Sequence, residues 1–200
     1  LELRVKGVNV TPGYFRNPEK TAEAFDEEGY YRLGDAVKFV DPAIPEKGLA
    51  FDGRTVEEFK LASGTWVSAG AVRMAAVTAS GGVLSDAVVC GLNRDEIGLL
   101  GFLNEAFCQR LAGGGVTLDA LVRHPEIEAA LRKGLAAHNK ANPNASARIA
   151  RILLQDIQPR PDLGEITEKG YLNQSRTQEL RAGQIEALYS DRDVPGKFLI

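Results

Sequence analysis

Three residues of this chain have the chemistry that binding a nucleotide and reacting at its phosphate would need. Asp35 follows a glycine at a predicted strand entry, Arg54 follows another glycine, and Lys169 lies in a loop of glycine and small polar residues. A carboxylate can accept hydrogen bonds from two adjacent hydroxyls, as on a ribose, and the donor fork of arginine suits hydroxyls or phosphate. A flexible lysine can bring its ammonium against a phosphate as negative charge develops. Each residue alone also fits a structural role, as turn residue, surface ion-pair partner and solvated lysine respectively.

A fourth feature is the segment Gly64-Thr65-Trp66, which directly follows a short strand expected at residues 59–61. Its glycine allows the backbone to approach a ligand closely, and Trp66 offers a surface for stacking or packing. The alternative interpretation is a hairpin turn that contributes one aromatic residue to the core.

The first part of the chain shows the pattern of short strands joined by turns. Residues 1–5 have the pattern of a strand already under way, and residues 37–40 and 48–51 flank a loop with proline and glycine, which predicts a β-hairpin. Residues 18–25 predict one short helix, because Asn17 is a good cap and proline suits the first helical position. This part is too small to stand alone, and its start inside a strand suggests a piece of a longer polypeptide.

Helices and strands alternate in the rest of the chain. The pattern predicts helices at 69–79, 105–111, 118–122, 124–138 and 174–189, and strands at 83–90, 97–103 and 149–154. His138 falls on the apolar face of its helix with Leu131 and Leu135, so we interpret it as a packed or edge histidine rather than a ligand. This second part has the size of an α+β domain that folds alone.

The composition excludes several classes of protein. The chain has 200 residues, 44% of them hydrophobic, and a formal net charge of -3, so it lacks the basic stripe that nucleic acid would need. Cys90 and Cys108 have no CxxC spacing, which predicts buried thiols in a reducing compartment rather than a metal site. No apolar run approaches the roughly 20 residues that span a bilayer. We therefore expect a cytoplasmic protein with no nucleic-acid, membrane or metal partner of its own.

The motifs of the whole chain, taken together, resemble those of the AMP-binding superfamily of adenylate-forming acyl-CoA synthetases, adenylation domains and luciferases. This resemblance rests on residues 9–18 (NVTPGYFRNP), 21–25 (TAEAF) and 29–35 (GYYRLGD). More narrowly, three further segments are similar to bacterial feruloyl-CoA synthetases, a group of acyl-CoA ligases. They are residues 48–54 (GLAFDGR), 58–67 (EFKLASGTWV) and 166–174 (ITEKGYLNQ).

The resemblance implies an ATP-dependent reaction in two steps. A carboxylate attacks the α-phosphate of Mg-ATP to give an acyl-adenylate and pyrophosphate, and the thiol of CoA then displaces AMP. By this resemblance Asp35 and Arg54 hold the ribose, and Lys169 bridges the carboxylate and the α-phosphate during adenylation. The implied cofactors are ATP, Mg²⁺ and CoA, and the implied substrate is a small carboxylic acid such as ferulate. The usual motif places a glycine before the catalytic lysine, whereas here a glycine follows Lys169.

The resemblance also implies that the C-terminal domain rotates between the two steps, so that one active site serves two chemistries. After the rotation Lys169 no longer lies in the active site. The loop of Gly64, Thr65 and Trp66 takes its place beside the pantetheine channel of CoA, and Lys60 assists in this second arrangement.

The implied fold is α+β. Residues 1–53 form the β-rich C-terminal end of the large AMP-binding domain, residues 54–58 a hinge that includes Val56 and Glu57, and residues 59–200 a small mobile C-terminal lid domain. The superfamily most often has Asp or Lys at the pivot, whereas here the residue is Val56.

The phosphate loop and the acyl pocket of the family belong to the larger domain, so we expect this fragment to be inactive without its own large N-terminal domain. Two alternatives stay open. One is an adenylating ligase for another aryl or fatty acid, or for a carrier-protein thiol. The other is a non-catalytic interaction domain of the same fold, against which the co-occurrence of Asp35, Arg54 and Lys169 argues.

Overall fold

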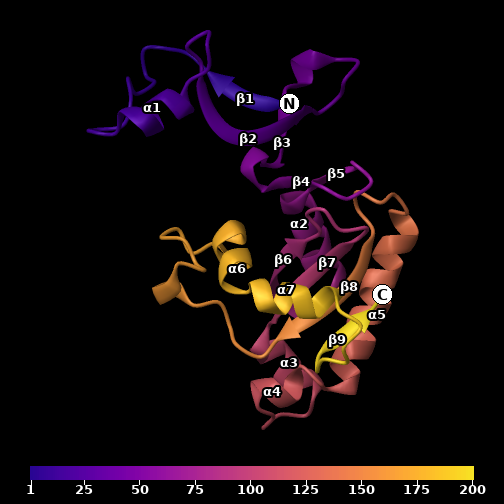
Figure 1. Ribbon diagram of the computed structural model, residues 1–200. Helices are drawn as coiled ribbons and strands as arrows, with labels where there is room; N and C mark the ends of the chain where they lie inside the picture. The colour runs from indigo at the N-terminus through magenta and orange to yellow at the C-terminus, as the bar shows by residue number, and fades with distance from the viewer. The chain divides into compact units, whose positions relative to one another are not determined.

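The computed structural model describes residues 1–51, 55 and 57–200, and for the remaining four residues only the bounds of the elements that contain them. The chain forms two compact units, Leu1–Glu57 and Glu58–Ile200. The boundary between them lies within the segment 54–58 that was expected to contain a hinge. Figure 1 shows the elements of each unit.

The first unit is a small antiparallel sheet with one helix. Its elements are β1 (Glu2–Val5), α1 (Pro18–Ala24), β2 (Tyr31–Phe39), the 3-10 turn η1 (Pro45–Lys47), β3 (Leu49–Arg54) and η2 (Thr55–Glu57), and the strand order is β1-β2-β3. The predicted hairpin of β2 and β3 and the predicted helix α1 are confirmed, and the side chain of Asn17 caps α1 by accepting from the Lys20 N–H at 2.9 Å. Among its described residues, only Ala36 and Val37 are buried hydrophobic residues.

The second unit is a four-stranded mixed sheet covered by helices. Its first elements are β4 (Glu58–Lys60), β5 (Trp66–Ser68), α2 (Ala69–Ala79), β6 (Leu84–Cys90), β7 (Ile97–Leu103), α3 (Glu105–Leu111) and α4 (Leu118–Leu121). They are followed by α5 (Pro125–Ala141), β8 (Ile149–Gln155), η3 (Pro161–Leu163), α6 (Gln174–Leu180), α7 (Ala182–Tyr189) and β9 (Lys197–Leu199). The strand order is β6-β7-β8-β9, in which only the β7–β8 pair is parallel, and β4 and β5 form a separate hairpin.

Both faces of this sheet are buried. Every residue of β7 is buried, which fits a central strand that reads as a continuous apolar run. On one face the sheet packs against α2 and α5, and the other face packs against Leu172 and against Leu188 of α7 (Figure 1). The α+β fold class is thus confirmed.

Several local predictions are confirmed. The helices α2 and α3 have the predicted bounds, whereas α5 starts at Pro125, one residue later than predicted, and extends to Ala141. His138 lies at the edge of the core, with its Nε2 at 3.0 Å from the Ala147 carbonyl oxygen. Cys90 and Cys108 are buried, and burial raises the pKa of their thiols to about 12 and about 11.

The prediction of one helix over residues 174–189 is wrong. The segment forms two helices, α6 and α7, because Arg181 between them leaves the helical conformation with φ -107° and ψ 27°. Its guanidinium is buried in an ion pair with Glu165, a partner that helical periodicity cannot reveal.

Candidate functional site

Lys169 lies in the tight turn of a small hairpin. Ile166 and Leu172 form an antiparallel bridge, the Thr167 N–H donates to the Tyr171 carbonyl oxygen at 2.8 Å, and the Gly170 N–H donates to the Thr167 carbonyl oxygen at 2.8 Å. The Lys169 side chain is exposed and has no hydrogen bond or ion pair with any residue that the structure describes. The backbone that carries the ammonium is therefore fixed by hydrogen bonds while the ammonium itself faces outward.

A buried ion pair lies at the base of this hairpin. Glu165 and Arg181 are only 2% and 6% exposed, and the Arg181 Nε donates to Glu165 Oε1 at 2.6 Å while its Nη2 donates to Oε2 at 3.0 Å. Burial by itself raises the pKa of Glu165, but hydrogen bonds from Arg181 and from the Arg160 N–H outweigh it and lower the pKa. Glu165 is therefore ionised at neutral pH. Sequence reasoning missed this pair, because Glu165 and Arg181 lie 16 residues apart and no local pattern links them.

A second anchor holds the segment that leaves the hairpin. The Gln174 side chain accepts from the Val89 N–H at 3.2 Å and donates to the Val89 carbonyl oxygen at 2.6 Å. Val89 belongs to β6, which is the outer strand of its sheet. The amide of Gln174 thus satisfies the backbone of an edge strand in the way a neighbouring strand would, and it ties α6 to the sheet.

Gly64 and Thr65 lie in the turn of the β4–β5 hairpin, and Trp66 is the first residue of β5. The Gly64 N–H donates to the Leu61 carbonyl oxygen at 2.8 Å, and Gly64 has φ +82°, a conformation that favours glycine. Trp66 is 60% exposed, so the interpretation of Trp66 as a core aromatic residue is wrong. The Lys60 Nζ lies 4.7 Å from the centre of the Trp66 ring, which is a cation–π arrangement.

The turn between β6 and β7 supports this hairpin. The Ala62 N–H donates to the Arg94 carbonyl oxygen at 2.8 Å, and the Asn93 N–H donates to the Lys60 carbonyl oxygen at 3.0 Å. Asn93 adopts a left-handed φ of 57°, which asparagine tolerates better than most residues. The link between the β6–β7 turn and the candidate loop could not be read from the sequence, because its residues lie about thirty positions apart.

The ribose-binding candidates belong to the first unit. Asp35 lies inside β2 and is half-buried, so the prediction that it stands at a strand entry is wrong. The pairing register of β2 shifts between Asp35 and Val37, and such irregularities re-aim side chains. Arg54 and Val56 lie outside the described residues, and Glu57 ends η2.

The structure brings some candidates together and leaves others apart. Lys60 and Trp66 lie side by side, whereas the hairpin of Lys169 and the β4–β5 turn lie at separate places on the second unit (Figure 1). One small unit thus presents two distinct loops, each held by its own hydrogen bonds.

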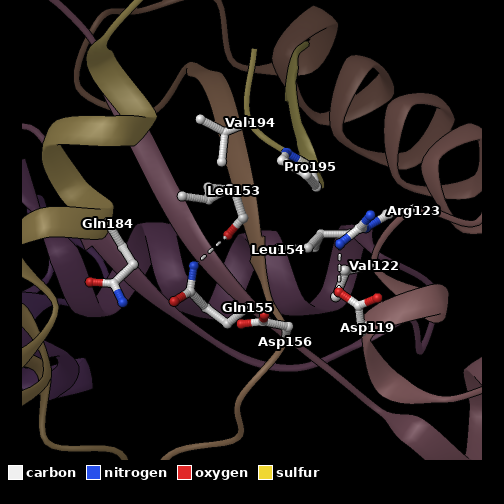
Figure 2. A pocket seen from close by; sticks show the side chains of 10 residues that line it. All are labelled: Asp119, Val122, Arg123, Leu153, Leu154, Gln155, Asp156, Gln184, Val194 and Pro195. Carbon is white, nitrogen blue, oxygen red and sulfur yellow. Dashed lines mark hydrogen bonds and ion pairs between the residues drawn. The ribbon is translucent and has the colours of Figure 1, made fainter. Parts of the chain in front are cut away.

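A cavity of about 160 Å³ lies at the end of β8. Figure 2 shows its lining, in which the Gln155 amide nitrogen donates to the Leu153 carbonyl oxygen and Arg123 pairs with Asp119. The ten lining residues are Asp119, Val122, Arg123, Leu153, Leu154, Gln155, Asp156, Gln184, Val194 and Pro195, and they include none of the candidate site residues.

Two further findings concern only the part of the chain that the structure describes. Within residues 1–51, 55 and 57–200, no group of three or more His, Cys, Asp or Glu side chains is placed to hold a metal ion. None of the helices described has the length and apolar character that crossing a bilayer requires.

No protein-family model matches the chain. The long-chain-fatty-acid–CoA ligase FadD15 of Mycobacterium tuberculosis is 33% identical over 196 residues, which cover 94% of this chain and 31% of that protein. The adenylation domain of the carboxylate reductase of Mycobacterium chelonae has a TM-score of 0.71 and 26% identity, over 95% of this chain and 28% of that structure.

The homologues of the present chain are adenylate-forming acyl-CoA and carboxylate ligases. The adenylation domain of the carboxylic acid reductase of Segniliparus rugosus, solved with AMP and a carboxylic acid, shares the fold with a TM-score of 0.74 at 22% identity, over 94% of this chain and 28% of that structure. The chain spans less than a third of the length of each of these adenylate-forming proteins.

Proposed function

We propose that this chain is the C-terminal part of an ATP-dependent acid–thiol ligase. The complete enzyme would adenylate a carboxylate with Mg-ATP, release pyrophosphate, and transfer the acyl group to CoA with release of AMP. The observation that carries the proposal is Lys169, an exposed ammonium on a hydrogen-bonded hairpin turn, in a chain that aligns over 94% of its length with an acyl-CoA ligase.

The catalytic role of Lys169 follows from charge. During adenylation negative charge builds between the carboxylate and the α-phosphate, and an ammonium brought there lowers the barrier more than it stabilises the ground state. Asp35 and Arg54 would hold the ribose of ATP. ATP would bring the Mg²⁺, and we assign no ligand of that ion to the described part of this chain.

The second half-reaction would use the β4–β5 turn. Gly64 and Thr65 leave room for a narrow ligand such as pantetheine, because nothing lies within 4 Å of the position of a Cβ on Gly64. Trp66 and Lys60 form one exposed wall beside it. The hinge at 54–58, with Val56 and Glu57, would bring first Lys169 and then this turn to the shared active site. The large N-terminal domain completes that site.

The properties of the first unit support its assignment as part of a larger domain. Its exposed apolar residues include Val40, Leu49 and Phe51, at 59%, 47% and 66% exposure. A unit with so little buried hydrophobic surface does not fold stably on its own. We therefore expect these 200 residues alone to lack activity.

For the acyl group we propose a hydroxycinnamate such as ferulate, which is supported by the similarity of residues 48–54, 58–67 and 166–174 to feruloyl-CoA synthetases.

For the acceptor of the acyl group, a second candidate besides CoA is a carrier-protein thiol. It is favoured by the 42% identity over 67 residues with the carboxylic acid reductase of Segniliparus rugosus, whose adenylation domain has been solved together with a carrier domain. Comparing ATP–pyrophosphate exchange with ferulate, coumarate, benzoate and a long-chain fatty acid tests the acid, and offering CoA or a carrier domain tests the acceptor. A preference for the fatty acid would refute the hydroxycinnamate.

The test of the mechanism is Lys169→Ala in the full-length ligase. Carboxylate-dependent ATP–pyrophosphate exchange should fall by at least about 10²-fold, while thioester formation from a supplied acyl-adenylate should survive. Lys133→Ala, which removes an exposed lysine of α5, is the matched control and should change neither half-reaction. Equal loss of both half-reactions in Lys169→Ala would refute the role.

A further inference from the structure

The two arms of the Lys169 hairpin meet at Glu165. Glu165 directly precedes the bridge residue Ile166, and its carbonyl oxygen accepts from the Asn173 N–H at 2.8 Å. The chain entering the hairpin and the chain leaving it therefore meet at Glu165. A displacement of this residue moves both arms of the hairpin.

The Arg181 guanidinium binds Glu165 with two of its donors and the end of β8 and the loop after it with the other three. Besides its bonds to the carboxylate, its Nη1 donates to Gln155 Oε1 at 2.9 Å and to the Ile157 carbonyl oxygen at 3.0 Å, and its Nη2 donates to the Gln158 carbonyl oxygen at 3.2 Å. A guanidinium has five N–H groups, and all five are used. The side chain thus ties Glu165 to the end of β8.

The energetics of this pair suggest that it determines position. Taking two charges out of water costs about as much as their attraction returns, so a buried ion pair is weak support for stability and apolar residues often replace it without loss. Here the chain also interrupts a helix at Arg181 to place the guanidinium. The pair instead fixes the orientation of Glu165, because the planar guanidinium and the carboxylate fit together in one orientation.

We propose that Glu165 and Arg181 are positioning residues for adenylation, which hold the hairpin so that Lys169 reaches the reacting phosphate. This inference rests on the proposed function of Lys169. Both residues act through the backbone of the hairpin and neither touches the substrate.

The test is Glu165→Gln in the full-length ligase, which keeps the shape of the side chain and removes its charge. ATP–pyrophosphate exchange should fall by about tenfold or more, since a misplacement of about 1 Å can cost up to about 10²-fold. Thioester formation from a supplied acyl-adenylate should stay within about twofold, because the β4–β5 turn does not depend on this pair. Equal losses in both half-reactions would overturn the proposal.

Asp86→Asn is the matched control. Asp86 pairs with Arg73 in a partly buried, two-pronged ion pair between β6 and α2, away from the hairpin. The Asp86→Asn substitution should lower stability without lowering the rate of one half-reaction more than that of the other. If Lys169→Ala lowers exchange but Glu165→Gln does not, the positioning role is wrong and the proposed function stands. If neither variant lowers exchange, the proposed function fails first.

Hydrogen exchange provides a readout that does not need turnover. In Glu165→Gln the amides of Thr167 and Gly170, which donate within the hairpin, should exchange at least about tenfold faster, while those of β7 keep their protection. Unchanged exchange of the two hairpin amides in a folded variant would overturn the proposal. Faster exchange throughout the sheet would overturn it as well, because the pair would then be a general stabiliser.

Discussion

Gly134 provides a sharp test of how closely α5 and α2 pack. In an isolated helix an interior glycine costs about 1 kcal/mol relative to alanine, so Gly134→Ala would ordinarily stabilise α5. Here a Cβ on Gly134 would lie 2.0 Å from the Ala79 carbonyl oxygen and 3.0 Å from its carbonyl carbon. We expect the substitution to destabilise the protein instead.

The size of the effect follows from this geometry. The obstructing atoms belong to the backbone at the end of α2, so no side-chain rotation can relieve the clash. Real Cβ contacts stay above 3.0 Å, and the two helices must therefore separate by roughly 1 Å. That separation loosens the buried contacts of Leu131 and Leu135. Overpacking typically costs up to about 3 kcal/mol, and subtracting the gain in helix propensity leaves a net loss of about 2 kcal/mol.

The assay is urea unfolding of the 200-residue chain, followed by far-ultraviolet circular dichroism. With a slope of about 2 kcal/mol per molar urea, a loss of about 2 kcal/mol lowers the midpoint by about 1 M. Gly183→Ala in α7 is the control, because nothing lies within 4 Å of the position of its Cβ. It should leave the midpoint unchanged or raise it. A rise in the midpoint for Gly134→Ala would refute the close packing of α5 on the end of α2.

Two further predictions follow from the site. Trp66→Ala should lower thioester formation from a supplied acyl-adenylate by about tenfold or more and leave ATP–pyrophosphate exchange unchanged; a loss of exchange alone would place Trp66 in the other half-reaction. Burial raises the pKa of Glu165, but the bonds from Arg181 outweigh this effect and lower the pKa. The ionised form of Glu165 therefore stabilises the fold above the unfolded pKa of about 4.3. This stabilisation is lost as the pH falls through the folded pKa. The urea midpoint should therefore fall less steeply in Glu165→Gln between about pH 5 and pH 3, and equal slopes would contradict the lowered pKa.

Local signals predicted much of the fold. The cap residue Asn17 marks the start of α1. The central strand β7 is a continuous apolar run of the kind typical of a strand buried on both faces. Such features depend on residues that lie close together along the chain, so a single sequence is enough to predict them. The bounds of α2 and α3 agree with prediction for the same reason.

Long-range contacts set the features that the sequence did not predict. Arg181 interrupts a helical pattern because its partner lies sixteen residues earlier, and Gln174 reaches Val89 across 85 residues. Trp66 is exposed although its residue type favours burial, and no periodicity distinguishes the two outcomes. The candidate residues themselves could be named in advance, but the pair that fastens the Lys169 hairpin could not.

The order of lysine and glycine in the hairpin has a physical reason. The turn closes with the Gly170 N–H donating to the Thr167 carbonyl oxygen, and Gly170 has φ +81° with nothing within 4 Å of the position of a Cβ. Conformation rather than space therefore selects glycine at this position, since other residues lose roughly 1–2 kcal/mol there. The residue before it is left exposed in the turn. A glycine after Lys169 thus serves the turn directly, and the departure from the usual order of the motif is compatible with a catalytic ammonium at this position.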